Sequence, residues 1–219
     1  MSVPTLSDQV MEMIRQDILS GQLPPKQKLV VAELKERYHV GASPIREALV
    51  QLSWRKYVIF TPQKGCWVMP VSASELDDLF KARLALTALL LPQAISHGDE
   101  AWEINILTHY HKLSRLMQGH INADVTEWIK RHHDFHLAIL AGSQSPTLMA
   151  LYQQVDEQIE RYRHIWLNQL IPDTQCWPGD NEHEAIMKAV LARDNQLAMT
   201  LLTDHSQPTL AIIKQYLAS

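Results

Sequence analysis

The feature of this sequence that most constrains its fold is a change in hydrophobic pattern near residue 70. After Ser74, apolar residues recur every three or four positions, and no stretch alternates between apolar and polar residues. Such spacing puts apolar side chains on one face of a helix, whereas a half-buried strand requires alternation. The chain beyond Ser74 is therefore predicted to be all-α and to form a unit separate from the residues before it.

Two domains are predicted, residues 1–70 and residues 75–219, joined by a short linker. A chain of 219 residues is long enough to bury two such cores. The second domain is expected to be a bundle of six helices separated by turn-forming stretches. They span approximately residues 75–97, 101–118, 124–142, 146–170, 180–193 and 195–217. The fold class is mostly α, with short strands expected only in the first domain.

The first domain contains two short helices joined by a tight break. Apolar residues mark a helix near Ala32–Tyr38, and His39-Val40-Gly41 interrupts it. Ser43 is the predicted N-cap of the next helix, and Pro44 suits its first turn because no amide hydrogen bond is lost there. This is a helix-turn-helix pattern, whose second helix reads bases in the major groove with its N-terminal residues. Ser43 and Arg46 are predicted to be exposed at that end.

A β-hairpin is predicted directly after the second helix. β-Branched and aromatic residues flank Gln63-Lys64-Gly65 on both sides, which favours two short strands with glycine at the bend. A helix-turn-helix followed by a hairpin is a winged helix. At its tip, Lys64 can approach phosphates by charge, and Gly65 can approach the minor groove because it has no side chain. The alternative for Arg46 is a glutamate partner or a helix cap, without base contact.

Charge is distributed unevenly between the two domains. Residues 1–70 contain nine Lys and Arg and six Asp and Glu, a net charge of +3. The remaining residues contain eleven Lys and Arg and eighteen Asp and Glu, a net charge of −7. A basic first domain fits a polyanionic partner, although composition alone leaves that open. We find no unbroken apolar run of about 18 residues, no signal-peptide pattern and no CxxC pairing of Cys66 with Cys176. A cytoplasmic protein with no membrane segment is predicted.

Histidines of the second domain are spaced as metal ligands. His132 and His136 are four residues apart and share a helix face. His183 and His205 lie eleven residues before and after Asp194, at the turn between the last two predicted helices. Equal offsets put them at one height, about 16 Å from the turn at 1.5 Å per residue. Four imidazoles could thus converge on a divalent ion, with Zn²⁺ or Ni²⁺ best suited. Taken singly, each histidine is more often a surface or hydrogen-bonded core residue.

The first domain resembles the winged-helix domain of GntR-family bacterial transcription regulators. The matching motifs are IRQDILSGQLPP, SPIREAL and QKGCWV, which occur in the family's order and spacing within about residues 6–70. The resemblance implies DNA contact by four residues, Ser43, Arg46, Lys64 and Gly65.

Two positions depart from the family pattern. The family usually has arginine where Ala42 stands, and often a basic residue near Ala32. Either the operator differs from the common family pattern, or other basic residues contribute to phosphate binding, among them Lys28, Lys35 and Arg37.

The second domain resembles the FCD ligand-binding domain of the FadR subfamily. The matching stretches are DLFKARLAL, HHDFHLAILAG, ERYRHIW and NEHEAIMKAVLARDNQLAMTLLTDHS. The resemblance implies a divalent metal held by His132, His136, His183 and His205, with a small organic acid as effector. The family usually has Asp or Asn at the position of His132. Four neutral histidines leave the full charge of a divalent ion in place, which should favour an anionic ligand.

Three arginines are candidates for binding the rest of the effector, because guanidinium groups bind carboxylates in bidentate fashion: Arg83, Arg161 and Arg163. For each, the alternative is an ordinary salt bridge. GASPIREAL and ERYRHIW also resemble carbon-starvation-induced regulators of dicarboxylate use, which implies a dicarboxylate such as glutarate. The predicted function is a homodimeric, DNA-binding repressor of a catabolic operon that responds to such an acid.

Two other functions are weighed against a regulator. A four-histidine centre with open positions could activate water in a metal-dependent hydrolase-like enzyme. However, the histidine pair lacks the glutamate of an HExxH motif, and its nearest carboxylate, Asp134, is expected to face away. The chain is therefore predicted not to be an enzyme. The remaining alternative is a metal-free bundle that serves only dimerisation.

Overall fold

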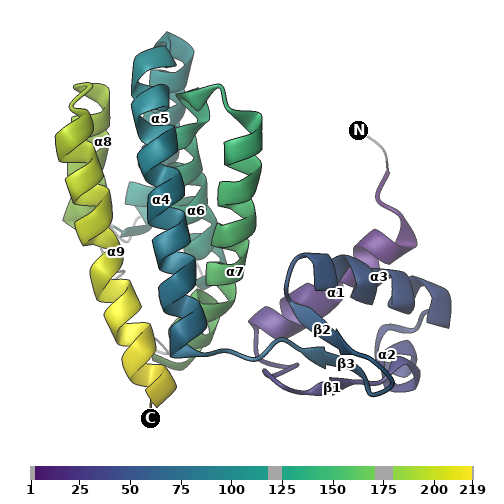
Figure 1. Cartoon of the computed structure of the whole chain (residues 1–219). Coiled ribbons are helices and arrows are strands. Elements are labelled where there is room, and N and C mark those ends of the chain that lie inside the picture. The colour runs from purple at the N-terminus through teal and green to yellow at the C-terminus, as the bar shows by residue number, and fades with distance from the viewer. Residues whose placement is uncertain (1–2, 118–124, 171–179, 219) are drawn as a thin grey trace. The chain divides into compact units, whose positions relative to one another are not determined.

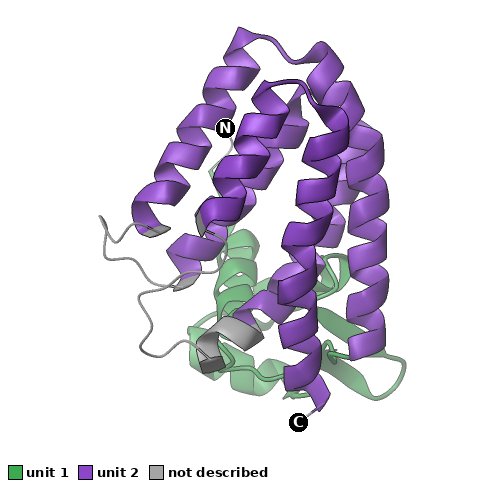
Figure 2. Cartoon of the chain, turned by 90° about the vertical axis from the view of Figure 1, so that its left-hand side faces the viewer, with its two compact units in different colours: residues 1–72 green, residues 73–219 purple. Residues whose placement is uncertain are grey.

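The computed structural model of the protein describes residues 3–117, 125–170 and 180–218. The chain forms two compact units, residues 1–72 and residues 73–219 (Figure 2). Cys176 and most of the two expected connectors at residues 119–124 and 172–180 lie outside the described residues.

The first unit is built from α1 (Leu6–Leu19), α2 (Val31–Tyr38), α3 (Ala42–Trp54) and a small sheet (Figure 1). α1 begins at a capping box, in which the Thr5 hydroxyl accepts from the Asp8 amide and the Asp8 carboxylate accepts from the Thr5 amide. The buried core lies between α1 and α3 and includes Val10, Ile14, Ile45, Leu49 and Leu52. This packing fixes α3 on the unit and leaves its other face to solvent.

The sheet has the strand order β1-β3-β2, with antiparallel neighbours: β1 (Lys28–Leu29), β2 (Val58–Thr61) and β3 (Gly65–Val68). The predicted hairpin is present, and Thr61 pairs with Gly65 at its closed end. β1 was not predicted, because two residues are too few to show alternation. The winged helix-turn-helix architecture is thereby confirmed.

One detail of the prediction is wrong: α3 does not begin at Ser43. Its N-cap is Gly41, in extended conformation, and no side chain caps it. His39, in the left-handed region at φ 54°, ends α2, so the next helix starts earlier than expected. Ser43 instead lies in the first turn, where its hydroxyl donates to Glu47 at 3.3 Å. Pro44 is tolerated there because first-turn amides have no partner within the helix.

The second unit is a helical bundle, as predicted (Figure 1). Its elements are α4 (Ala73–His97), α5 (Glu100–Met117), α6 (Val125–Leu140), the short 3-10 helix η1 (Ala141–Ser143), α7 (Pro146–Leu170), α8 (Asp180–Leu191) and α9 (Asn195–Ala218). α4 packs against α7 and α9, α5 packs against α6, and α8 packs against α9. The bundle thus brings the pair α6 and α7 and the pair α8 and α9 around α4 and α5.

α4 is, within the described part of the chain, the helix that is long and apolar enough to cross a membrane by length and composition alone. The apolar run within α4 is too short to count as an unbroken membrane span, because charged residues and Pro92 interrupt the helix. Its inner face buries Leu76, Phe80, Arg83 and Leu90, and it packs against α7 and α9. We therefore treat α4 as a core helix of the bundle.

Arg193 fixes the turn between α8 and α9 to the far end of α4. It has φ 59°, and its guanidinium donates to the carbonyl oxygens of Ile95 at 2.6 Å and Gly98 at 3.0 Å. The same group pairs with Glu103 and lies 4.8 Å from the centre of the Trp102 ring. This contact holds the α8–α9 hairpin against α4 and α5, and so sets the height at which residues of α8 and α9 lie.

Candidate metal centre and nucleic-acid interface

Four histidines from three helices meet inside the second unit. His132 and His136 lie one turn apart on α6, His183 lies on α8 and His205 on α9. One ring nitrogen of each lies within 4.8 Å of the other three. The Nε2 atom of His132 is 3.2 Å from Nε2 of His136 and 3.3 Å from Nε2 of His205. The fold thus brings together the four histidines whose spacing in the sequence resembles that of metal ligands.

These distances fit ligands of one ion. With metal–nitrogen bonds of about 2.0–2.1 Å, neighbouring ligand atoms lie about 3.0–3.4 Å apart. The protonation pattern also fits. Nδ1 of His205 is 2.6 Å from Oε2 of Glu182, and an ionised carboxylate only accepts, so the proton of a neutral ring stays on Nδ1. Nε2 of His205 then presents a lone pair to the centre, which is the donor that Zn²⁺ or Ni²⁺ requires.

Burial keeps these imidazoles neutral. Loss of hydration, followed by repulsion from neighbouring histidines, lowers the pKa of both His132 and His136 well below the usual value. Burial, with smaller effects of Arg83 and Arg163, lowers the pKa of His205 to about 4. Near neutral pH a metal would therefore bind the rings without first displacing protons.

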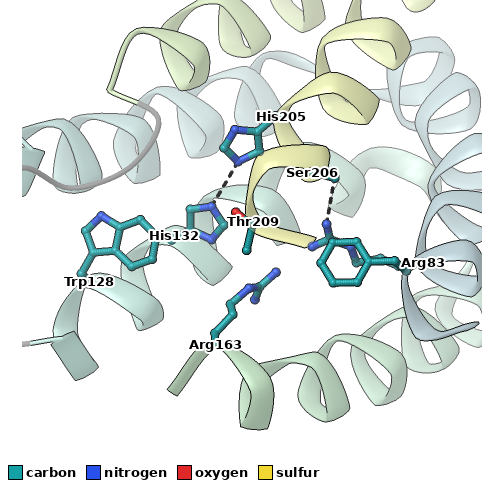
Figure 3. Close-up of a pocket in the computed structure, with 8 residues that line it drawn as sticks. Arg83, Trp128, His132, Arg163, His205, Ser206 and Thr209 are labelled. Carbon is teal, nitrogen blue, oxygen red and sulfur yellow. Dashed lines mark hydrogen bonds between the residues drawn. The ribbon is translucent and has the colours of Figure 1, made fainter. Parts of the chain in front are cut away.

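The ring of His132 is held by stacking. Trp128 lies one helical turn earlier on α6, and its ring centre is 4.8 Å from that of His132, with 24° between the planes. Figure 3 shows the indole lying beside the imidazole at the edge of a cavity. Trp128 thereby limits the orientations available to a ring at the centre of the cluster.

A small cavity, partly open to solvent, adjoins the histidines (Figure 3). Its lining combines two imidazoles, two guanidinium groups, two hydroxyls and two aromatic rings: His132, His205, Arg83, Arg163, Ser206, Thr209, Phe80 and Trp128. A second small cavity shares Arg83 and Ser206 with the first and reaches His136. The lining of the first cavity therefore presents hydrogen-bond donors at one side and apolar surface at another.

The two cavity arginines are held by one buried carboxylate, that of Asp156. Asp156 Oδ1 accepts from Arg83 and from Arg163, each at 3.3 Å, and Oδ2 lies 2.7 Å from Nδ1 of His133. Burial alone would raise the pKa of Asp156, but Arg163, His133 and Arg83 together hold it well below its usual value. Arg83 also donates to Ser206 at 2.9 Å. Two guanidinium groups around one carboxylate leave the wall cationic.

Arg161 does not join the other two predicted arginines. It is buried, but its guanidinium lies 3.6 Å from Glu75 and 5.7 Å from the centre of the Tyr162 ring, and it does not line the cavity. Residues two apart on a helix point to nearly opposite sides, so Arg161 and Arg163 cannot face the same site from α7. Arg83 and Arg163 are the pair that the fold places beside the histidines.

Several residues of this site were missed in the sequence, notably Asp156, Glu182, Trp128, Ser206 and Thr209. Two of them carry a signal in retrospect. Asp156 precedes Arg163 by two helical turns, so the two share a face of α7. Trp128 precedes His132 by one turn on α6. Ser206 and Thr209 are ordinary hydroxyl residues of an amphipathic helix, and no local pattern distinguishes them.

The expected DNA-contacting residues are exposed on the first unit. Ser43 and Arg46 lie on the outer face of α3, and Lys64 and Gly65 lie at the tip of the hairpin. Lys35 is exposed on α2. These side chains are therefore accessible to a nucleic acid.

Arg37 is engaged within the unit. Its guanidinium pairs with Asp17 at 2.6 Å and donates to Gln22, also at 2.6 Å. Its charge is thus largely balanced before any phosphate arrives, which distinguishes it from Lys35 and leaves it the weaker phosphate-contact candidate.

The tip of the wing depends on a glycine. Gly65 has φ 120°, a conformation that other residues rarely adopt. A Cβ built there would lie 3.6 Å from Cε of Lys28, whose Nζ lies 5.7 Å from the centre of the Trp67 ring. A second cation of the wing, Lys28, therefore lies beside Gly65.

Comparison with known proteins supports both halves of this description. Residues 6–68 match the family described as bacterial regulatory proteins, gntR family, and residues 78–207 match the FCD domain. The HTH-type transcriptional repressor GlaR of Escherichia coli K12 is 35% identical over 207 residues, 94% of each chain. The HTH-type transcriptional regulator McbR of the same strain is 23% identical over 213 residues, 96% of this chain and 94% of that protein.

Solved structures show the same fold. The structure of E. coli McbR/YncC superposes with a TM-score of 0.79 at 21% identity and covers 98% of this chain and 99% of that one. A GntR-type regulator from Rhodococcus sp. RHA1 gives a TM-score of 0.71 at 18% identity, with 94% and 96% covered. With a winged helix, an FCD bundle and a repressor relative along nearly its whole length, the chain belongs to the GntR family and is a DNA-binding transcriptional regulator with an FCD domain.

Proposed function

We propose that the protein is a cytoplasmic, homodimeric repressor of a catabolic operon, and that a small organic acid bound beside a divalent metal in the second unit weakens its hold on operator DNA. The observation that carries the proposal is a cluster of four histidines that adjoins a cavity lined by two arginines. A core evolved only for packing would not gather so many buried nitrogen donors at one place.

The cavity offers complementary groups to an acid. The metal, Zn²⁺ or Ni²⁺, would be held by the four histidines and would supply open positions for a carboxylate oxygen. Arg83 and Arg163 provide guanidinium donors, and Ser206 adds a hydroxyl. Phe80 and Trp128 provide apolar cover for a short carbon chain. These features favour a dicarboxylate such as glutarate, with one carboxylate toward the histidines and the other toward the arginines.

The first unit would read half of a two-fold operator. One winged helix contacts a single half-site, so two copies are needed for a palindromic sequence. Ser43 and Arg46, which are exposed, would contact base edges, while Lys64, Gly65 and Lys35 would contact the backbone or the minor groove. For the acid to relieve repression, it must bind more tightly to the conformation that does not fit the operator.

The names of similar proteins help to choose among the alternative functions, an enzyme and a metal-free dimerisation bundle. GlaR is named a repressor, and the matching families consist of regulators, so the chain is not an enzyme. The hydrolase-like alternative is thereby set aside. The alternative that remains is a metal-free bundle used for dimerisation, and metal content separates it from the proposal.

The first experiment is elemental analysis of the purified protein beside two double variants. The test variant is His132→Ala/His136→Ala. The matched control is His109→Ala/His111→Ala, which removes two histidines of α5 that lie outside the cluster. We expect about one Zn²⁺ or Ni²⁺ per chain in the wild type and the control, and none in the test variant. Metal-free protein throughout would favour the dimerisation bundle.

The effector is then sought by titrating small mono- and dicarboxylates into a complex of the protein with its operator. Release of labelled DNA that requires both the acid and the metal would support the proposal. Release that persists after the ion has been removed by a chelator would contradict the role given to the metal.

A further inference from the structure

Glu182 stands directly before His183 on α8, but its carboxylate reaches across to α9. Its Oε2 atom lies 2.6 Å from Nδ1 of His205, and the side chain of Glu182 is 51% exposed against 11% for His205. One turn of α8 thus contributes the imidazole of His183 to the cluster. It also contributes the Glu182 carboxylate, which pairs with the imidazole of His205 on α9.

The contact decides which nitrogen of His205 can bind a metal. A neutral imidazole has one protonated and one bare nitrogen, and only the bare nitrogen is a ligand. Because an ionised carboxylate accepts and never donates, Glu182 keeps the proton on Nδ1. The bare Nε2 is then the atom that lies 3.3 Å from Nε2 of His132, at the centre of the cluster.

The ring of His132 is oriented by different means. His132 stacks on Trp128, and its Nδ1 has no hydrogen-bond partner within the described residues. Stacking fixes the plane of a ring but does not choose between its nitrogens, whereas a carboxylate at Nδ1 fixes both the orientation and the tautomer. The donor atom of His205 is therefore set by a side chain that does not itself join the cluster.

We propose that Glu182 is a positioning residue of the metal centre, which fixes the tautomer of His205 and increases the donor strength of its Nε2. The inference rests on the proposed metal site and adds to it a residue outside the ligand set. Loss of a carboxylate that supports a ligand imidazole weakens metal binding about 10- to 100-fold. The competing explanation is an exposed ion pair of no consequence to the metal, which the exposure of Glu182 would also permit.

The test uses the full-length protein and two substitutions that separate geometry from charge. Glu182→Ala removes the acceptor, while Glu182→Gln keeps an amide oxygen that can still accept from Nδ1 but carries no charge. The matched control is Glu184→Gln, two residues along α8, where the carboxylate pairs with Lys188 at 2.7 Å on the helix surface. All three changes remove one negative charge from the same helix.

The first readout is the dissociation constant for Zn²⁺, measured by competition with a chromogenic chelator. We expect Glu182→Ala to raise it about 10- to 100-fold, Glu182→Gln to raise it less, and Glu184→Gln to leave it unchanged. An unchanged constant in Glu182→Ala, or an equal rise in Glu184→Gln, would overturn the inference.

The second readout needs no metal. Long-range ¹H–¹⁵N spectra of the protein after a chelator has removed any bound metal report which nitrogen of His205 carries the proton. We expect the Nδ1–H form in the wild type and in Glu182→Gln, and a mixture or the Nε2–H form in Glu182→Ala. If Glu182→Ala keeps the wild-type tautomer, Glu182 does not position the ring. If the wild type binds no Zn²⁺, the proposed metal site fails, and the tautomers still decide the role of Glu182.

Discussion

Arg46 is the residue for which we predict the largest part in sequence readout. It lies exposed on the outer face of α3, near the helix N-terminus that enters the major groove in helix-turn-helix proteins. For the second unit we predict a corresponding part for Arg163, which lines the cavity beside His132 and His205. Each of these residues supports a prediction with a nearby arginine as its control.

Replacing Arg46 with alanine should lower affinity for the specific operator by about 1–3 kcal/mol, because a bidentate contact to guanine is lost. Arg55→Ala, at the other end of α3, should cost far less. Fluorescence anisotropy on operator and scrambled DNA measures both. An equal loss on the two DNAs would assign Arg46 to phosphate contact alone.

Arg163→Ala should weaken binding of the effector acid by about 1.5–3 kcal/mol, the range for a hydrogen bond to a charged group. Arg161→Ala should leave acid affinity unchanged, because its guanidinium pairs with Glu75 away from the cavity. Isothermal titration calorimetry of the metal-loaded protein checks the contrast. Equal losses in the two variants would mean that the effect passes through folding of α7 rather than through the cavity.

At the residue scale, the sequence predicted what depends on spacing within or between neighbouring helices. The pair His132 and His136, and the equal offsets of His183 and His205, follow from helix geometry alone. It could not predict that Asp156 joins Arg83 to Arg163, because that contact depends on how α4 packs against α7. For the same reason the sequence could not separate Arg163 from Arg161 with respect to the cavity.

At the scale of elements, long amphipathic helices were predictable and short or capped features were not. α7 was expected with the ends that it has, and α5 within one residue at each end. β1, with two residues, pairs with β3 only because the loop before α2 returns to the sheet. α3 starts earlier than predicted, because the backbone conformations of His39 and Gly41 end the turn before Ser43. The capping preference of the Ser43 side chain does not predict those backbone conformations.

The junction of α4, α5 and the α8–α9 turn supports a prediction about stability. A Cβ at Gly98 would lie 2.1 Å from the ring of Trp102, and that ring is fixed by Arg193 and by its hydrogen bond to Ile139 at 3.1 Å. Gly98→Ala should therefore destabilise the second unit by about 1–3 kcal/mol through overpacking. Ser96→Ala, at an exposed position on the same helix end, is the control. Calorimetric unfolding that is the same for both would contradict the packing account.

At the scale of the whole molecule, proton and metal binding are linked through folding. The pKa values of His132, His136 and His205 are lower in the folded protein than in the unfolded chain, where histidine titrates near 6.5. Their neutral forms therefore contribute stability that is fully present above about pH 6.5. That stability is lost as the pH falls toward the folded values, which for His205 is about 4.

For the protein freed of metal by a chelator, the free energy of unfolding should accordingly decrease as the pH falls from about 6.5 to about 4. The decrease should be up to about 1.4 kcal/mol per pH unit for each titrating histidine. The His132→Ala/His136→Ala variant should show a shallower dependence because two of the groups are gone. Thermal unfolding in chelator at several pH values measures this. Parallel curves for the two proteins would contradict it.

The placement of the four histidines also bears on how the second unit holds together. An ion there would tie α6 to the α8–α9 hairpin and close a long loop of chain that contains α7. The hairpin can form locally, because α8 and α9 are joined by a short turn and pack against each other, whereas α6 joins it across that loop. The metal would thus act as a removable cross-link in a protein whose Cys66 is an unpaired thiol. Withdrawal of the ion would release the helix that carries half of the ligands, so loss of the effector site and loosening of the bundle would be one event.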